Sequence, residues 1–286
     1  MTTTRLYLWL ALYCYAGTSL PIANLCDYGC DCPASSFYVL PISNPNMNAD
    51  ATAVCSTLLA ANTSKIVFAG DSLMRDLWTT ASLFLLKADA FDAQAMGQEH
   101  ACMICAWKYL EPLGIRRKLL SHGFLTERLT STESVYTMLV CGGQLSLVFR
   151  YGRLFSDAAA IRKEAQSAWL VVSHGILEMS DYEHAPRERI HEWLAQFDSK
   201  RTFYMGAHAR IPEQAPTEFR HDADWTQSNA KIREWTKAAL SSHTVNVLDP
   251  YNLTVGLTKE YRDSDDGLHF GYFINLQKFR MLVSLL

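Results

Sequence analysis

Short hydrophobic runs alternate with segments of helical period along most of the chain. β-branched and aromatic residues dominate these runs, which is typical of buried strands. Strands that alternate with helices predict one parallel sheet covered on both faces, with its ligand crevice at the carboxyl ends of the strands. Few regular signals occur between residues 88 and 134. The pattern predicts strands at residues 66–69, 135–140, 145–151, 169–173, 202–206 and 244–248, and helices from residue 72 and at 158–166, 186–197, 226–240 and 273–286.

One of these strand-to-helix junctions carries a serine. The apolar residues 66–69 are followed by Gly70, which allows a sharp turn, and Leu73 and Leu77 then follow a helical period. Ser72 would therefore stand at the start of a helix, beside free backbone N–H groups and the positive end of the helix dipole. Both features suit an oxyanion, so the position is typical of a serine nucleophile.

A base and an orienting acid for this serine occur far along the chain. Asp266 and His269 form an Asp-x-x-His pair that follows the predicted strand at 244–248. Three aspartates lie within reach of His269, namely Asp263, Asp265 and Asp266. A three-residue spacing lets the side chains of Asp266 and His269 project from one turn toward the same crevice, whereas Asp265 is expected to point elsewhere if that turn is regular. A histidine held by a carboxylate can accept the proton of a serine.

Together these residues resemble the SGNH (GDSL-like) hydrolase superfamily. The shared features are Gly-Asp-Ser at 70–72, a strand leading into Asp-Pro-Tyr-Asn-Leu-Thr at 249–254, and Asp-Gly-Leu-His at 266–269, in an order that spans about residues 64–286. Within the superfamily the chain is most similar to the PC-esterase branch. That branch includes the plant trichome-birefringence-like polysaccharide O-acetyltransferases and the luminal domains of sialic-acid and fungal capsule O-acetyltransferases. Arg75 fits its Gly-Asp-Ser-x-x-Arg pattern.

The resemblance implies a fold and a set of site residues. The fold is a three-layer α/β/α sandwich with a central, mostly parallel sheet, as in SGNH and flavodoxin-like proteins. The chemistry needs neither a metal nor another cofactor. The implied roles are Ser72 as nucleophile, His269 as general base and Asp266 as its partner, with Asp71, Arg75 and Gly175 as supporting residues around the oxyanion.

The chain also departs from the superfamily pattern. SGNH hydrolases usually supply two more oxyanion donors, a glycine after the second strand and an asparagine after the third. Gly142 and Gly143 are weak candidates for the glycine, and no asparagine follows the predicted strand at 169–173. Members of the PC-esterase branch often lack that asparagine too, so the second donor stays unidentified. His174 and Glu178 have a spacing that metal ligands use, but without further ligands at a recognisable spacing we interpret them as site-rim or structural residues.

Composition limits the partners of the chain. It has 286 residues, 49% of them hydrophobic, and a formal net charge of −3. That length suffices for one sizeable α/β core, and the absence of basic blocks argues against a nucleic-acid partner. We see no internal repeat and no linker after about residue 60.

The N-terminal residues predict entry into the secretory pathway. Arg5 precedes an apolar stretch that is shorter than the ~20 residues needed to span a bilayer. We therefore divide the chain into a signal peptide at 1–23, a cysteine-containing segment at 24–60 and an SGNH-like catalytic domain at 61–286. An uncleaved signal anchor is the alternative for the first segment, and it is the one case in which the protein would contact a membrane.

The cysteines and glycosylation sequons agree with an oxidising compartment. Of the 8 cysteines, Cys14 lies in the expected signal, and the odd number that remains predicts up to three disulfides with one free thiol. The Cys102-x-x-Cys105 pair lacks a second pair at metal spacing. Asn62 and Asn252 begin Asn-x-Ser/Thr sequons. We expect a secreted protein or one that resides in the lumen of the ER or Golgi.

These observations predict a serine-dependent enzyme that moves an acyl group, with acetyl the expected group, to or from a glycan hydroxyl. An esterase and an O-acyltransferase use the same three residues, so both remain open, as do the acyl donor and the glycan. Exposed aromatic residues could stack on sugar rings, with core packing as the competing role; the candidates are Trp78, Trp225 and Tyr261. The alternatives are a catalytically inactive glycan-binding module and a lipase or thioesterase of the same superfamily.

Overall fold

A computed structural model describes residues 50–86, 115–130, 133–174, 187–214, 229–242, 244–258, 264 and 266–286. The segment predicted as a signal peptide and the cysteines at 26, 30, 32, 102 and 105 lie outside these ranges. The aromatic residues Trp225 and Tyr261 and the site residue Gly175 lie outside them as well.

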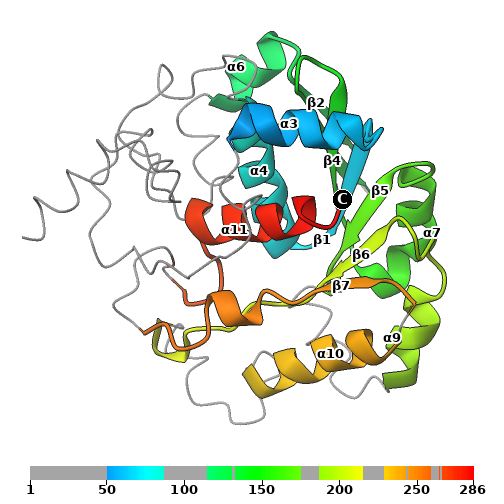
Figure 1. The fold of residues 1–286 in the computed structure, drawn as a ribbon, viewed down its shortest axis with the longest axis vertical. Coiled ribbons are helices and arrows are strands. Elements are labelled where there is room, and N and C mark those ends of the chain that lie inside the picture. Colours follow the sequence, from blue (N-terminus) through cyan, green and yellow to red (C-terminus); the bar gives the residue numbers. More distant parts are fainter. Residues whose placement is uncertain are drawn as a thin grey trace, which may run out of the picture.

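The described residues build a seven-stranded sheet in the order β2-β3-β4-β1-β5-β6-β7 (Figure 1). Five neighbouring strands, from β4 to β7 in that order, are parallel, and β2 and β3 run antiparallel at one edge. The strands are β1 (Lys65–Gly70), β2 (Leu125–Leu129), β3 (Ser134–Val140), β4 (Leu145–Tyr151), β5 (Trp169–Val172), β6 (Thr202–Met205) and β7 (Asn246–Leu248).

Helices cover both faces of the sheet (Figure 1), which confirms the predicted α/β fold with a mostly parallel sheet. Helices α3 (Ala51–Ala60), α4 (Ser72–Leu86) and α11 (Tyr272–Val283) contribute to the hydrophobic cluster on one face. Helices α7 (Leu154–Glu164), α9 (Arg187–Leu194) and α10 (Asn229–Ser242) contribute to the cluster on the other. The shorter elements are α6 (Ile115–Ser121) and the 3₁₀ turns η5 (Pro212–Gln214) and η7 (Tyr251–Leu253).

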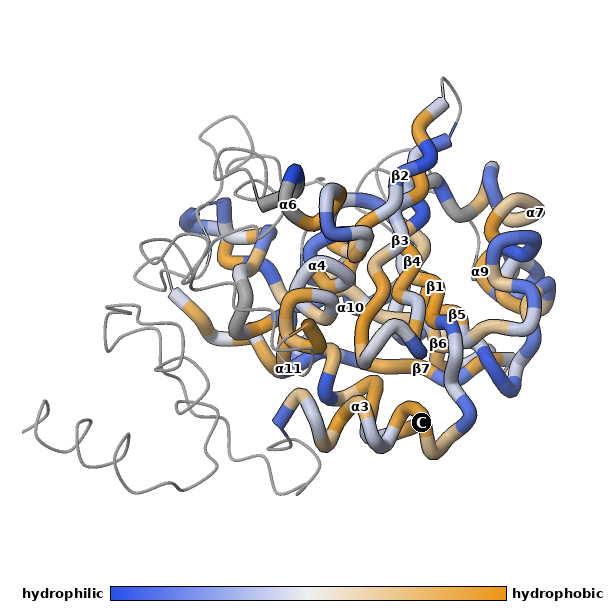
Figure 2. Tube along the Cα trace, turned by 90° about the horizontal axis from the view of Figure 1, so that it is seen from above, coloured by the Kyte–Doolittle hydropathy of each residue, from blue (hydrophilic) through white to orange (hydrophobic). Residues whose placement is uncertain are grey.

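Strand β1 shows why the central strands are apolar throughout. Ile66 and Phe68 belong to the first cluster, Val67 and Ala69 belong to the second, and all four are fully buried. A strand between two helical layers has no solvent face, so it loses the polar alternation of an edge strand. In Figure 2 the strands are accordingly mostly hydrophobic, and hydrophilic segments lie toward the periphery.

The order of the parallel strands fixes where a ligand site can form. Taken in chain order, β1, β4, β5, β6 and β7 have the spatial order 2-1-3-4-5, which is that of flavodoxin-like sheets. The chain leaves β1 toward β4 on one side and later returns to β5 on the other. The carboxyl ends of β1 and β5 therefore border the switch point, where open α/β sheets bind ligands.

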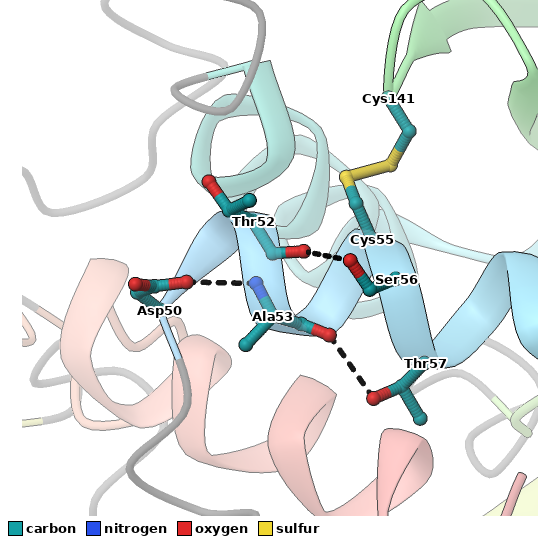
Figure 3. The surroundings of a disulfide bond; sticks show 7 residues. All are labelled: Asp50, Thr52, Ala53, Cys55, Ser56, Thr57 and Cys141. Atoms are coloured by element: carbon teal, nitrogen blue, oxygen red, sulfur yellow. Dashed lines mark hydrogen bonds between the residues drawn. A yellow bond between two sulfur atoms is a disulfide. The ribbon is translucent and has the colours of Figure 1, made fainter.

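Helix α3 is attached to the sheet by a disulfide bond. Asp50 caps its first turn by accepting a hydrogen bond from the N–H of Ala53 at 2.7 Å, and Cys55 is bonded to Cys141 in the turn before β4 (Figure 3). Asn62 ends the helix with a φ of +55°, a conformation that a residue after a helix C-cap often adopts. The disulfide agrees with the oxidising compartment predicted from the cysteine count.

Three described helices and strands were not predicted from the hydrophobic pattern: α3, β2 and α6, the last of which lies in the region between residues 88 and 134 that shows few regular signals. Strand β2 has the burial pattern of an edge strand, with only Leu125 buried, so its polar residues hide the strand signal. Helix α3 is rich in alanine, serine and threonine, and it lies in the segment predicted as a cysteine-containing region before the catalytic domain. Its buried residues, including Val54 and Leu58, nevertheless join the core of the sheet.

Candidate active site

The turn between β1 and α4 places Ser72 at the first position of the helix. A side chain on Gly70 would lie 3.0 Å from Met74 Cβ and 3.3 Å from the Ser173 carbonyl oxygen, so the close approach of β5 and α4 requires glycine there. Asp71 caps the helix, since its Oδ1 accepts a hydrogen bond from the N–H of Leu73 at 3.0 Å. Ser72 stands in the first turn, where backbone N–H groups lack partners within the helix.

Ser72, His269 and Asp266 form one hydrogen-bonded chain. His269 Nε2 lies 2.7 Å from Ser72 Oγ, although the two residues are 197 positions apart, and His269 Nδ1 lies 2.6 Å from Asp266 Oδ2. A carboxylate only accepts hydrogen bonds, so Nδ1 carries the proton of the neutral imidazole and Nε2 has a free lone pair. The Ser72 hydroxyl then donates to Nε2, which is the arrangement in which a histidine removes a proton from serine.

The Asp266–His269 turn is tightly constrained. Asp266 Oδ1 accepts the backbone N–H groups of Leu268 at 2.9 Å and His269 at 2.7 Å. Gly267 has a φ of +69°, and a Cβ on it would lie 2.0 Å from the carbonyl oxygen of Ile211, whose N–H donates to the Gly267 carbonyl at 2.8 Å. Only glycine combines this backbone conformation with this approach.

The pKa of Asp266 is low because of these contacts. Burial alone would raise it, but the hydrogen bond from the His269 ring, the backbone N–H groups and the charge of His269 outweigh burial and lower the pKa of Asp266 to about 2. Asp266 is therefore ionised at neutral pH. The buried Arg210 acts on this carboxylate, and its own pKa is lowered by burial to about 10 while the charge of Asp266 opposes that shift.

Three carboxylates control the pKa of His269. Burial lowers it, but the hydrogen bond and charge of Asp266 raise it, and the charges of Asp76 and Asp71 add to that effect. The net result is that the pKa of His269 is raised above its usual value. Asp76 is 2% exposed and lies one turn after Ser72 on α4. The sequence gives no sign of this role, because an aspartate inside a helix ordinarily faces solvent.

The supporting residues expected from the resemblance have different positions. Asp71 caps α4 and lies close enough to His269 to affect its pKa. Arg75 follows Ser72 by one turn, with its side chain 25% exposed and Nη2 3.5 Å from the Asp76 carboxylate. Gly175 lies outside the described residues, so its expected role stays a prediction.

His174 is packed among aromatic rings. Its ring centroid lies 4.8 Å from that of Trp235 and 4.9 Å from that of Phe155, and its Nδ1 is hydrogen-bonded to the Tyr204 hydroxyl at 3.1 Å. Burial lowers the pKa of His174 to about 3, so the ring is neutral. His174 is therefore a structural residue of the core, as one of its two sequence-based interpretations has it, and not a residue on the rim of the site. Glu178 lies outside the described residues, and no group of three or more His, Cys, Asp or Glu side chains within the described ranges could hold a metal ion.

The topology excludes one candidate for the second oxyanion donor. Gly142 and Gly143 precede β4, whereas Ser72 follows the carboxyl end of the parallel strand β1. The two glycines thus lie near the amino ends of the parallel strands, about 20 Å along the strand direction from Ser72 at the carboxyl end of β1. Gly152 is the glycine at the carboxyl end of β4, and its N–H donates to the Gly70 carbonyl at 3.1 Å.

Trp78 is fully buried, so of its two possible roles core packing applies and stacking on a sugar ring does not. Its Nε1–H donates to the Leu147 carbonyl at 2.9 Å, and its ring stacks on Phe149 with centroids 5.8 Å apart. Trp78 lies one helical turn after Arg75, so the sequence does not show whether its ring is exposed, but in the structure the ring faces the sheet.

Comparison with protein-family models and with curated proteins found no match to this chain. The chemistry of the site therefore has to be inferred from its geometry. A serine at a helix N-terminus, an imidazole with its lone pair toward that serine, and an ionised carboxylate behind the imidazole can together form and break an acyl–serine bond.

The close approach of Gly267 to Ile211 predicts that Gly267→Ala destabilises the protein more than Gly256→Ala. Both glycines have positive φ, +69° and +83°, but an alanine Cβ at 256 would meet no atom within 4 Å. Gly256→Ala should cost about 1 kcal/mol of unfolding free energy for the backbone conformation alone. Gly267→Ala should cost a further ~1–3 kcal/mol for the clash. Denaturant unfolding of both variants measures the difference, and equal losses would contradict the close approach.

The contacts of His269 predict that Asp266→Asn lowers its pKa. The asparagine removes the charge and hydrogen bond that raise the pKa, so the burial that lowers it is opposed mainly by Asp76 and Asp71. NMR titration of the His269 imidazole measures the change. Asp265→Asn is the control, because Asp265 is the neighbouring acidic residue and should leave the pKa almost unchanged. A larger decrease in Asp265→Asn than in Asp266→Asn would mean that Asp266 is not the main partner.

Proposed function

We propose that this protein is a serine-dependent acyl esterase or O-acyltransferase that acts on glycan hydroxyls through an acyl-serine intermediate, with acetyl as the expected group. The observation that carries the proposal is the hydrogen-bonded chain from Ser72 through His269 to Asp266. The position of Ser72 also supports the proposal, because this residue follows the carboxyl end of β1 at the switch point of the sheet, where α/β proteins bind ligands.

In the first half-reaction Ser72 Oγ attacks the ester carbonyl carbon while its proton moves to His269 Nε2. The carbonyl oxygen becomes an oxyanion, and the N–H of Ser72 at the start of α4 is available to stabilise it. The tetrahedral intermediate then loses the alkoxide, which takes the proton from His269, and the acyl group remains on Ser72. Asp266 stays ionised throughout and stabilises the imidazolium that forms.

In the second half-reaction an acceptor hydroxyl attacks the acyl-serine. His269 removes the proton of that hydroxyl and returns it to Ser72 Oγ as the acyl group leaves. Water as acceptor makes the protein an esterase, and a sugar hydroxyl makes it a transferase. Both outcomes use the same described residues, so the acceptor decides between them.

The carbohydrate substrate and the acetyl group rest on the resemblance to the PC-esterase branch. A catalytically inactive glycan-binding module remains the alternative, and the intact Ser72–His269 hydrogen bond of 2.7 Å argues against it. A lipase or thioesterase would use the same three residues with a longer acyl chain. A panel of acetylated sugars, short and long acyl esters, and a glycan acceptor, read by mass spectrometry, distinguishes these functions.

The mechanism predicts that Ser72→Ala abolishes acyl turnover and leaves the fold intact. Ser72 is partly exposed and its side chain bonds only to His269 among the contacts described, so its removal should barely change stability. Turnover of the best ester in the panel should fall by ~10³ or more. A fluorophosphonate probe should label wild type at Ser72.

Ser56→Ala is the matched control, because Ser56 is an exposed serine on α3 whose hydroxyl bonds only to the Thr52 carbonyl at 2.9 Å (Figure 3). It should keep full turnover and full labelling. A folded Ser72→Ala protein with near-normal turnover, or labelling at another serine, would contradict the assignment of the nucleophile.

We also propose that the protein resides in the secretory lumen or is secreted. The Cys55–Cys141 disulfide supports this, as do the exposed side chains of Asn62 and Asn252, which begin the two sequons. No helix within the described ranges has the length and apolar character to cross a bilayer.

The proposed location predicts N-linked glycans on protein made in a eukaryotic secretory system. Glycosidase treatment should lower the mass of the wild-type protein, and the Asn62→Gln/Asn252→Gln double variant should not respond to it. Cys55 and Cys141 should resist alkylation until a reductant is added. Reactive thiols at both cysteines in the native protein, together with unmodified Asn62 and Asn252, would count against the location.

A further inference from the structure

A second buried polar cluster lies beneath the His269 turn and has no part in the acyl-transfer steps described above. It consists of His208 in the segment after β6, with Asn275 and Lys278 on α11. These side chains are only 2–3% exposed. A lysine this deep in a protein is costly unless its hydrogen-bonding groups are satisfied, so its presence calls for a reason other than packing.

The contacts of His208 fix its tautomer. Its Nε2 lies 2.6 Å from the carbonyl oxygen of Leu268, which only accepts hydrogen bonds, so Nε2 carries the proton. Its Nδ1 lies 2.6 Å from Lys278 Nζ and accepts a hydrogen bond from it. Burial and the charge of Lys278 hold the pKa of His208 well below its usual value, which keeps the ring in this neutral form.

Lys278 also holds the other side of the turn. Its Nζ donates to Asn275 Oδ1 at 3.0 Å, and Asn275 Nδ2 donates to the carbonyl groups of Phe270 at 2.5 Å and Gly271 at 3.0 Å. The backbone carbonyls immediately before and after His269 are therefore bound by side chains that meet at Lys278.

The peptide unit between Leu268 and His269 connects this cluster to the site. Its carbonyl accepts from His208, and its N–H donates to Asp266 Oδ1 at 2.7 Å. The other oxygen of Asp266 accepts from His269 Nδ1 at 2.6 Å. Hydrogen bonds thus run without interruption from Lys278 through His208, this peptide unit, Asp266 and His269 to Ser72, and hydrogen bonds in such a chain strengthen one another.

We propose that Lys278 and His208 are positioning residues of the acyl-transfer site, which hold the Leu268–His269 peptide unit so that Asp266 and His269 keep the geometry needed to activate Ser72. This inference rests on the proposed function. It extends the site from the turn that carries Asp266 and His269 to the segment after β6 and the middle of α11. A misplacement of about 1 Å at a reacting group can cost ~10² in rate, which is the scale of the effect expected here.

Lys278→Met tests the proposal, because methionine fills a similar volume and cannot donate to His208. We expect kcat to fall about 10²-fold with KM little changed, since the turn is displaced while substrate contacts remain. The pKa of His269 should also fall. A loosened turn weakens the Asp266 hydrogen bond that raises this pKa. Burial, which lowers the pKa, is then opposed by the charges of Asp266, Asp76 and Asp71 without the full contribution of that bond, while Arg210 still faces Asp266.

Lys65→Met is the matched control. Lys65 is a partly buried lysine that bonds to Glu164 Oε1 at 2.9 Å and begins β1, at the end of the strand away from Ser72. Its loss should change stability without moving the pH profile of kcat/KM or the pKa of His269. A merely structural role for Lys278 would give the same result as this control.

A pair of variants at His208 tests the same chain of bonds if Lys278→Met does not fold. His208→Gln retains an amide N–H that can reach the Leu268 carbonyl and an oxygen that can accept from Lys278. It should keep kcat within about 3-fold of wild type. His208→Leu has neither group and should lose about 10²-fold, as Lys278→Met does.

Non-additivity gives the final criterion. Because Lys278 acts through Asp266, Lys278→Met should cost far less in the Asp266→Asn background than in wild type. Unchanged kcat and unchanged His269 pKa in folded Lys278→Met, or equal losses in both His208 variants, would overturn the inference while leaving the proposed function intact. A wild-type protein with no turnover and no labelling at Ser72 would instead overturn the proposed function, and the NMR titration of His269 would still decide the positioning role.

Discussion

The site depends on the hydrogen bond between Ser72 Oγ and His269 Nε2, and that bond depends on two turns being held in place independently. The first turn is fixed from within the sheet, by the contact of Gly70 with β5 and the capping of α4 by Asp71. The second turn does not directly follow any strand in the part of the chain that the structure describes. It is fixed from outside, by the backbone of Ile211 and by side chains of the segment after β6 and of α11. The sheet therefore positions Ser72, the proposed nucleophile, directly, while His269, the proposed base, is held by the elements that follow β6 and β7.

Electrostatic effects at His269 act in opposite directions. Burial favours the neutral ring, which can act as a base, whereas Asp266, Asp76 and Asp71 favour the charged ring that the proposed reaction would form. A site with burial alone would resist protonation of the imidazole, and a site with carboxylates alone in water would hold it protonated. In the proposed mechanism this combination would let one ring accept and release a proton within a single cycle.

The features predicted from the sequence are those with local signals. The apolar run of β1, the glycine before Ser72 and the three-residue spacing of Asp266 and His269 each follow from short-range geometry, and the structure brings these side chains together. Strand β2 was missed because an edge strand keeps polar residues, and α3 was missed because small residues give it little periodicity.

The contact partners and the burial of individual side chains could not be predicted from such local signals. Nothing near His208 in the sequence indicates that its ring meets Lys278, 70 positions later, or that both are buried. The sequence leaves His174 as a site-rim or structural residue, and it does not show that the aromatic rings around it come from β6, α7, α9 and α10, which are distant in the chain. The environment of an ionisable group is a property of the tertiary structure, so a sequence pattern can identify a candidate residue without showing which side chains surround it.

The separation of 197 positions between Ser72 and His269 has a consequence for the newly made chain. Synthesis proceeds from the N-terminus, so β1 and the start of α4 emerge long before the turn that supplies the base. Until β6 and β7 have joined the sheet and α11 has packed against α4, Ser72 lacks its hydrogen bond to His269 and, under the proposed function, would be an ordinary alcohol. If Ser72 is the proposed nucleophile, its reactivity would appear only in the last stage of folding, and a fluorophosphonate that labels Ser72 would report the completed sheet.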